Sequence, residues 1–175
     1  SVIVTVTDDG TGELKANVEY KLDGENVEAI SFENLYHASP VNIELMGTKT
    51  LAGRSLADGE FNFRLYETDS EFVVGENALQ TVANNANGEF TFDAITFETE
   101  GERYFVITEE NTEKIGVKYD ETVYRITVKV VDNGVGSLVA ETNITNDQNV
   151  DTESIVFANV YEPLSTEVKI DVLKT

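Results

Sequence analysis

The chain has 175 residues and no cysteine, and its 33 acidic residues against 12 Lys and Arg give a formal net charge of −21. Such a surface is a poor partner for nucleic acid or anionic lipid, and the disulfide-stapled class of secreted domain is excluded. No apolar run is long enough to cross a membrane, so no membrane insertion is expected of these residues.

The two ends of the chain resemble each other. Three pairs of segments match: DDGTGEL at 8–14 with DNGVGSL at 132–138, FENLY at 32–36 with FANVY at 157–161, and GTKT at 47–50 with VLKT at 172–175. The shift is 124 residues for the first pair and 125 for the other two. A nearly constant shift is typical of tandem repeats. We therefore expect 1–36 to be the C-terminal strands of a preceding repeat, 37–163 a complete repeat, and 164–175 the first strand of a following repeat.

Within the complete repeat, apolar and polar residues alternate with the period of two that is typical of half-buried strands. Turn signals such as LADGE, NANGE and DNGVG separate the alternating stretches. Seven strands are predicted, near 41–50, 59–67, 89–97, 102–110, 121–132, 137–143 and 153–161. The less regular residues 68–88 could hold an extra strand or a short helix. The pattern predicts an all-β fold, an immunoglobulin-like antiparallel β-sandwich.

Three polar residues fall on strand faces that are otherwise apolar. Lys49 shares a face with Val41, Ile43, Leu45 and Gly47, Glu109 with Phe105 and Ile107, and Asn159 with Ile155, Phe157 and Tyr161. Each has an ordinary explanation taken alone. A Lys at a strand end can reach water, an Asn can satisfy a neighbouring backbone group, and a Glu near a turn can face solvent.

Together the three residues suggest covalent chemistry. Burial favours the neutral form of a lysine amine, which is a nucleophile, and the protonated form of a carboxyl group. A protonated Glu could donate a hydrogen bond to the amide oxygen of Asn and polarise its carbon. Attack by the amine, with loss of ammonia, would leave a Lys–Asn amide, and the Glu would move the protons.

A resemblance to a known family rests on four motifs that occur in order: KTLAGRSLADGEFNFRLYE, YFVITEEN, YDETVYRITVKVVDNGVGSL and IVFANVY. The chain resembles the streptococcal-type pilin isopeptide-linkage domain of Gram-positive surface proteins. Members of that family are CnaB-type, immunoglobulin-like sandwiches with an intramolecular Lys–Asn isopeptide bond and a catalytic Glu. The resemblance implies that Lys49 is the amine donor, Asn159 the acceptor and Glu109 the acid and base. Glu110 is a second choice, because its side chain alternates to the other face.

The incomplete repeats carry matching residues. By the same resemblance, Asn34 would be the acceptor of the preceding repeat and Lys174 the donor of the following one, where Val168, Ile170, Val172 and Lys174 share a face. One further option is strand exchange, in which residues 164–175 of one molecule complete residues 1–36 of the next. That exchange could include a Lys174–Asn34 crosslink.

The resemblance implies a structural stalk or pilus-shaft repeat, extracellular and attached to a Gram-positive cell wall, with neighbouring repeats as partners. Its only chemistry would be a single-turnover crosslink, so no enzyme activity, cofactor or metal is expected. A ligand-binding adhesin module is the alternative, with a host-surface ligand held by a loop within 66–88. A domain acting on an outside substrate is the least expected, since the single histidine, His37, leaves little for a His-based catalytic triad or metal site.

Overall fold

The computed structural model describes every residue except 172 and 175. The described residues form strands and turns and contain no helix, which confirms the all-β prediction. They divide into two compact units, residues 1–37 and residues 38–175.

The first unit is a three-stranded antiparallel sheet of β1 (Val2–Asp8), β2 (Leu14–Leu22) and β3 (Glu25–Val27). Apolar residues pair across one of its faces: Val2 with Tyr20, Val4 with Val18, and Val6 with Ala16. All three valines on β1 are more than half exposed. This sheet therefore has an apolar face that no described residue covers.

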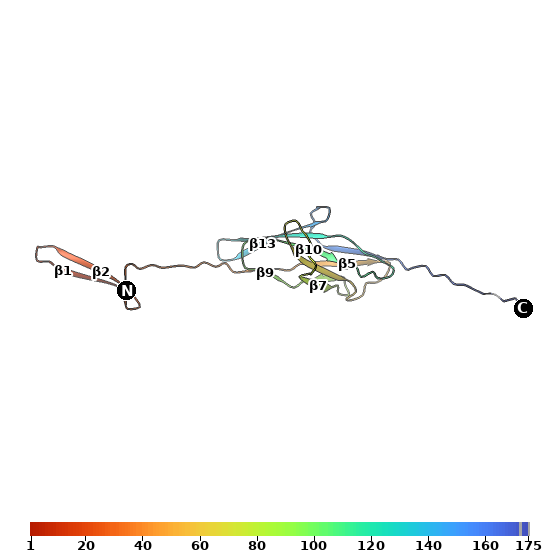
Figure 1. Cartoon of the computed structure of the whole chain (residues 1–175), viewed down its shortest axis with the longest axis horizontal. Helices are drawn as coiled ribbons and strands as arrows, with labels where there is room; N and C mark the ends of the chain where they lie inside the picture. The colour runs from red at the N-terminus through yellow and green to blue at the C-terminus, as the bar shows by residue number, and fades with distance from the viewer. Residues whose placement is uncertain (172, 175) are drawn as a thin grey trace. The chain divides into compact units, whose positions relative to one another are not determined.

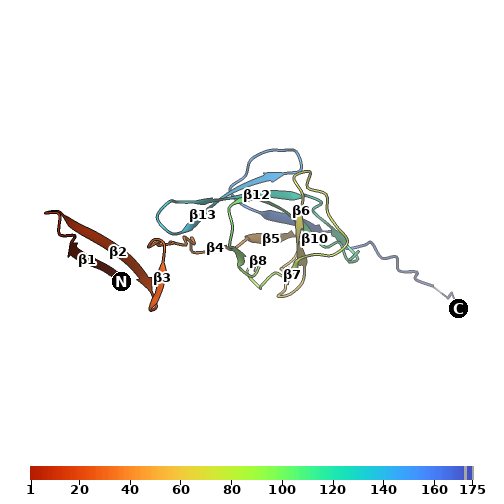
Figure 2. The same ribbon diagram turned by 60° about the vertical axis from the view of Figure 1, so that its left-hand side comes forward.

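The second unit holds eleven strands among its described residues. They are β4 (Val41–Ile43), β5 (Met46–Ala52), β6 (Asn62–Thr68), β7 (Gln80–Ala83), β8 (Glu89–Thr91), β9 (Ile95–Phe97), β10 (Gly101–Glu109), β11 (Val117–Lys118), β12 (Tyr124–Asp132), β13 (Leu138–Asn146) and β14 (Val156–Tyr161). A five-stranded sheet has the order β13-β12-β10-β6-β7, and a four-stranded sheet has the order β11-β14-β5-β8. Strands β4 and β9 form a separate pair, and Figures 1 and 2 label most of the elements.

Two of the predicted strands are each broken into two. The stretch 41–50 becomes β4 and β5, and the stretch 89–97 becomes β8 and β9. The breaks face each other, because Phe92 N–H donates to the Leu45 carbonyl oxygen at 2.9 Å and both side chains are buried. The two strands bend together at this point, so β4 pairs with β9 and β5 with β8. Within 68–88 the extra element is a strand, β7, and the short strand β11 was not predicted.

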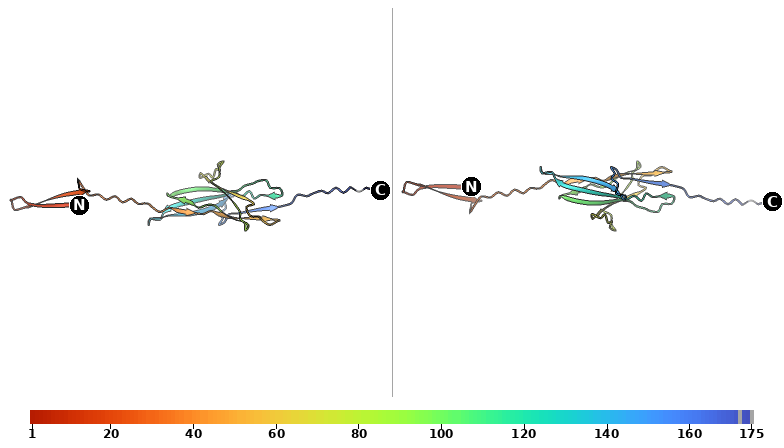
Figure 3. Two further views of the ribbon diagram at one scale, coloured as in Figure 1. Left: turned by 90° about the horizontal axis from the view of Figure 1, so that it is seen from below. Right: turned by 90° about the horizontal axis from the view of Figure 1, so that it is seen from above.

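One strand pair departs from the antiparallel prediction. Strands β5 and β14 pair in parallel, and their arrows point the same way in both views of Figure 3. The register sets Phe157 beside Lys49 and Asn159 beside Leu51. A parallel pair needs a long crossover between its strands, and here the whole body of the unit serves as that crossover. The chain consequently enters the sandwich along β4 at one end and leaves it along β14 at the other (Figure 2).

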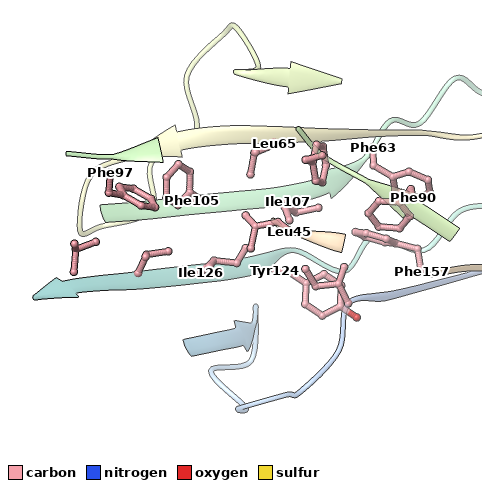
Figure 4. Packing of buried hydrophobic residues seen from close by; sticks show 14 of the residues in the cluster. Leu45, Phe63, Leu65, Phe90, Phe97, Phe105, Ile107, Tyr124, Ile126 and Phe157 are labelled. Atoms are coloured by element: carbon pink, nitrogen blue, oxygen red, sulfur yellow. The ribbon is translucent and has the colours of Figure 1, made fainter. Parts of the chain in front are cut away.

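The core lies between the two larger sheets and is dominated by phenylalanine. The rings of Phe63 and Phe90 stack with centroids 3.8 Å apart, and Phe157 lies 5.3 Å from both Phe63 and Tyr124 (Figure 4). Alternate residues of β6, β10 and β12 fill the rest, as the period of two predicts: Leu65, Phe105, Ile107, Ile126 and Val128 are at most 1% exposed.

The end of the chain after β14 forms no strand in its described residues, 162–171, 173 and 174. The strand expected at 164–175 therefore stays a prediction. Val172, which was expected to share a face with Lys174, lies outside the described residues.

Candidate functional site

The three polar residues predicted on apolar faces lie together inside the second unit. Lys49 comes from β5, Glu109 from the end of β10 and Asn159 from β14. The Lys49 Nζ is 2.7 Å from Glu109 Oε2, and Asn159 Nδ2 donates to Glu109 Oε1 at 2.7 Å. The side chains of Lys49 and Glu109 are 0% and 1% exposed, and Asn159 is 1% exposed. One buried carboxyl group thus bridges an amine and a carboxamide.

The backbone of Lys49 is fixed from both sides of its strand. On one side it pairs with Phe157 of β14, and on the other its N–H donates to the Gly88 carbonyl oxygen at 2.6 Å. Gly88 has φ +86°, and a Cβ added there would lie 2.1 Å from the Lys49 carbonyl oxygen. Only glycine fits this approach without strain.

Aromatic side chains exclude water from the amine. The ring centroid of Phe61 lies 4.9 Å from Lys49 Nζ, and Tyr119 meets that ring edge-on at 5.8 Å. A second lysine, Lys114, places its Nζ 4.9 Å from the same ring and donates to the Glu60 carbonyl oxygen. Sequence analysis did not anticipate Lys114 at this position.

Burial shifts both titrating groups toward their neutral forms. It lowers the pKa of Lys49 below its ordinary value of 10.5, with Glu109 opposing the shift. Burial also raises the pKa of Glu109 above its ordinary value of 4.5, and the contacts with Lys49 and Asn159 reduce this increase. The same site therefore favours an uncharged, nucleophilic amine beside a protonated carboxyl group.

The oxygen of the Asn159 carboxamide has a different partner from the expected one. The expectation was a hydrogen bond from protonated Glu109, but Glu109 contacts the amide nitrogen, and the backbone N–H of Asp120 donates to Oδ1 at 2.7 Å. This follows from the loop between β11 and β12, which brings the Asp120 amide against β14. A cavity of about 260 Å³, lined in part by Glu109, Asp120 and Tyr119, borders this point.

The Asp120 carboxylate is itself fully engaged. It accepts hydrogen bonds from the Thr122 N–H at 3.0 Å, the Thr122 hydroxyl at 2.6 Å and the Ala158 N–H at 2.8 Å. Burial alone would raise its pKa, but these hydrogen bonds outweigh burial and leave the pKa below the ordinary value. Sequence analysis missed Asp120. The available signal was the Asp-x-Thr spacing, which is typical of a turn in which the Asp side chain binds the backbone two residues on.

The other candidate residues lie elsewhere. Glu110 points away from the site and binds Asn62 Nδ2 at 3.0 Å and the Arg64 guanidinium. Asn34 in the first unit and Lys174 near the end of the chain are both exposed. Among the described residues there is no cluster of three His, Cys, Asp or Glu that could hold a metal ion. The described residues also contain no helix long and apolar enough to span a membrane.

Comparison with known proteins gives one family and several streptococcal relatives. The Spy0128-like isopeptide containing domain (FctA) matches residues 1–37 and 45–162. A curated pilin of Streptococcus pyogenes serotype M1 is 33% identical over 98 residues, which are 55% of this chain and 29% of that protein. The chain thus spans less than a third of this curated relative.

Two solved structures illustrate the structural matches. The major pilin from Streptococcus pyogenes is 26% identical with a TM-score of 0.48, and the match covers 67% of this chain and 50% of that one. The T-13 major pilin from S. pyogenes serotype GAS131465 is 17% identical with a TM-score of 0.49, covering 71% and 54%.

Proposed function

The chain belongs to the family of Spy0128-like isopeptide containing domains, and we propose that its residues 37–163 are a structural repeat of a pilus shaft or stalk. In this proposal the repeat locks itself with an isopeptide bond between Lys49 and Asn159, and Glu109 catalyses the bond. The observation that carries it is the single buried carboxyl group 2.7 Å from both the amine and the amide nitrogen. The repeat turns over no outside substrate.

The proposed reaction exchanges one amide for another. The Lys49 Nζ attacks the Asn159 Cγ and passes a proton to Glu109 Oε2. Glu109 gives a proton to Asn159 Nδ2 through Oε1, the Cγ–Nδ2 bond breaks, and ammonia leaves by the neighbouring cavity. The new Nζ–Cγ bond is the isopeptide bond, and Glu109 ends with the protonation it had at the start.

The position of the bond suits a load-bearing module. It would join β5 near the entry of the chain to β14 at its exit, so tension between the two ends would pass through a covalent bond. The strands between Lys49 and Asn159 would then carry no load. Such a lock needs no oxidant, which suits a cysteine-free chain outside the cell.

The proposal extends to neighbouring repeats. The pairing of β1 with β2 has the register of β12 with β13 at a constant shift of 124 residues: Val2–Tyr20 corresponds to Ile126–Ile144, and Val6–Ala16 to Val130–Ala140. Ile126 and Val130 are buried, whereas Val2 and Val6 are exposed. This supports residues 1–36 as the last strands of a preceding repeat. The proposal that residues 164–175 begin a following repeat rests on their sequence match alone. The partners would be such repeats, on the surface of a Gram-positive cell wall.

Intact mass under denaturing conditions tests the bond. We expect the wild-type protein to be lighter than its sequence by one ammonia, and the variants Asn159→Ala and Glu109→Gln to have their full mass. Glu109→Gln keeps the size of the side chain but cannot carry protons, so it is the closer control. A wild-type protein of full mass after complete folding would refute the proposal.

Single-molecule stretching tests the load-bearing role. The chain between Lys49 and Asn159 spans about 110 residues, so its release would lengthen the molecule by roughly 360–400 Å. We expect this step in Glu109→Gln and not in the wild-type protein. If the wild-type protein also lengthens by that amount, the bond does not carry the load.

A further inference from the structure

We propose that the backbone amide of Asp120 is an oxyanion donor for the crosslinking reaction, and that the Asp120 carboxylate is the positioning group that aims this amide. The inference rests on the proposed function, because it concerns the same reaction. It assigns the carbonyl oxygen of Asn159 a partner other than Glu109.

The geometry places the donor where charge develops. When the Nζ–Cγ bond forms, the electron pair of the C=O bond moves to Asn159 Oδ1, and it returns when the Cγ–Nδ2 bond breaks. The Asp120 N–H already donates to that oxygen at 2.7 Å. A fixed donor in a site that excludes water stabilises a forming oxyanion more than it stabilises the neutral amide. Asp120 would thereby lower the barrier as well as hold the reactant.

The nitrogen and the oxygen of the Asn159 carboxamide have different hydrogen-bond partners. Glu109 Oε1 accepts a hydrogen bond from the nitrogen that leaves, at 2.7 Å, so this oxygen is engaged at the nitrogen end of the carboxamide. Its other oxygen is occupied by Lys49. The oxygen of the carboxamide therefore needs a separate donor, and the Asp120 amide is the one that reaches it.

The carboxylate of Asp120 closes a reciprocal clamp with β14. The backbone N–H of Asp120 donates to the side chain of Asn159. In return, the backbone N–H of Ala158, the residue before Asn159, donates to the side chain of Asp120 at 2.8 Å. Hydrogen bonds from Thr122 hold the opposite carboxylate oxygen. The carboxylate therefore faces the backbone of β14 and its own turn, and fixes its own amide in register with the reacting oxygen.

The decisive experiment replaces the amide at residue 120 with an ester by semisynthesis, so that an oxygen atom, which cannot donate, takes the place of the N–H. The protein is made unfolded and uncrosslinked, refolded by dilution, and sampled for the loss of ammonia by intact mass. We expect the ester at 120 to slow the reaction by about 10²- to 10³-fold, the usual effect of losing one oxyanion donor. A matched ester at residue 122 removes a hydrogen bond to the Asp120 carboxylate but leaves the N–H on Asn159, and we expect a much smaller effect.

The outcomes separate this inference from the proposed function. If the wild-type protein never loses ammonia, the proposed function fails. If the wild-type protein reacts and the ester at 120 reacts at the same rate, only the present inference is refuted. Folding is followed in the same samples by circular dichroism, so that a slow reaction is not mistaken for slow folding.

Asp120→Ala provides a second test that does not depend on semisynthesis. It keeps the N–H but removes the clamp, and we expect a reaction at least tenfold slower. A purely structural role would lower stability without changing the rate once the protein has folded, and that result would overturn the positioning role of the carboxylate. Asp120→Asn retains one side-chain oxygen. If that oxygen accepts from Thr122, the NH₂ group faces the Ala158 N–H and that hydrogen bond is lost. We expect a reaction rate between those of the wild-type protein and Asp120→Ala.

Discussion

The largest expected effect of the proposed bond is on the free energy of unfolding. Comparing the wild-type protein with Glu109→Gln, which cannot form the bond, measures this effect. The variant keeps Lys49, Asn159 and the shape of the buried side chain, and it loses the carboxyl group that transfers the protons and faces Lys49. We expect its second unit to unfold at a markedly lower denaturant concentration than that of the wild-type protein.

The magnitude follows from the length of chain that the bond closes. A loop of about 110 residues between Lys49 and Asn159 loses roughly 4.8 kcal/mol of unfolded-state entropy when its ends are joined. For a domain of this size, 1 kcal/mol corresponds to about 3–5 °C in the melting temperature, so the expected shift is about 15–25 °C. The strands of the folded unit are already in contact at this point, so the folded state gains little new surface from the bond.

The assay is equilibrium unfolding in guanidinium chloride with thermal unfolding beside it. In Glu109→Gln a buried Lys49 amine faces a neutral amide, which adds its own cost. The double variant Lys49→Met/Glu109→Gln removes that cost, because it leaves no charge in the site. If the double variant is within about 1 kcal/mol of a wild-type protein that carries the bond, the loop-closure reasoning is wrong.

Three further predictions concern the effect of pH, the buried side chain of Asn84 and the backbone of Gly88. The rate of crosslinking should be bell-shaped in pH, because one proton must be shared between Lys49 and Glu109. Burial raises the pKa of Glu109 and lowers that of Lys49, so the acid limb should lie above pH 4.5 and the alkaline limb below pH 10.5. Asn84→Ala should cost about 2–4 kcal/mol of stability, since Asn84 is buried and satisfies three backbone groups. Gly88→Ala should lower stability by more than about 2 kcal/mol and slow the crosslink, because its Cβ would meet the Lys49 carbonyl oxygen.

Each of these has a control and a contrary result. A rate that climbs steadily to pH 10.5, as for an exposed lysine, would contradict a buried neutral pair. Asn87→Ala, at an exposed position in the same loop, should change stability by less than about 0.5 kcal/mol, and equal losses at 84 and 87 would contradict the role of Asn84. Gly59 also has a positive φ but no atom within 4 Å of an added Cβ, so Gly59→Ala should cost only about 1 kcal/mol of backbone strain. Equal losses of stability in Gly59→Ala and Gly88→Ala would contradict the predicted clash with the Lys49 carbonyl oxygen.

The face of each strand residue was predictable because side chains alternate with a fixed period of two. That rule placed Phe63, Leu65, Ile107 and Phe157 in the core, and it placed Lys49 and Asn159 on faces that prove to be buried. The tandem repeat was predicted from a different signal, three pairs of matching segments at a nearly constant shift, and it stays a prediction. The roles given to Lys49, Glu109 and Asn159 came from chemistry together with a family resemblance, and they remain to be tested by mass.

The partners of those faces were decided only by the tertiary structure. The parallel register that sets Phe157 beside Lys49 depends on how a crossover of about 100 residues closes, and no local pattern encodes it. The joint break at Leu45 and Phe92 requires both strands to bend at once, which neither sequence indicates alone. The donor to the Asn159 oxygen is a backbone N–H, and every residue except proline has one. The sequence alone therefore determined which side chains share a face. The tertiary structure determined which backbone amide contacts the Asn159 oxygen, because the fold of the loop places Asp120 there.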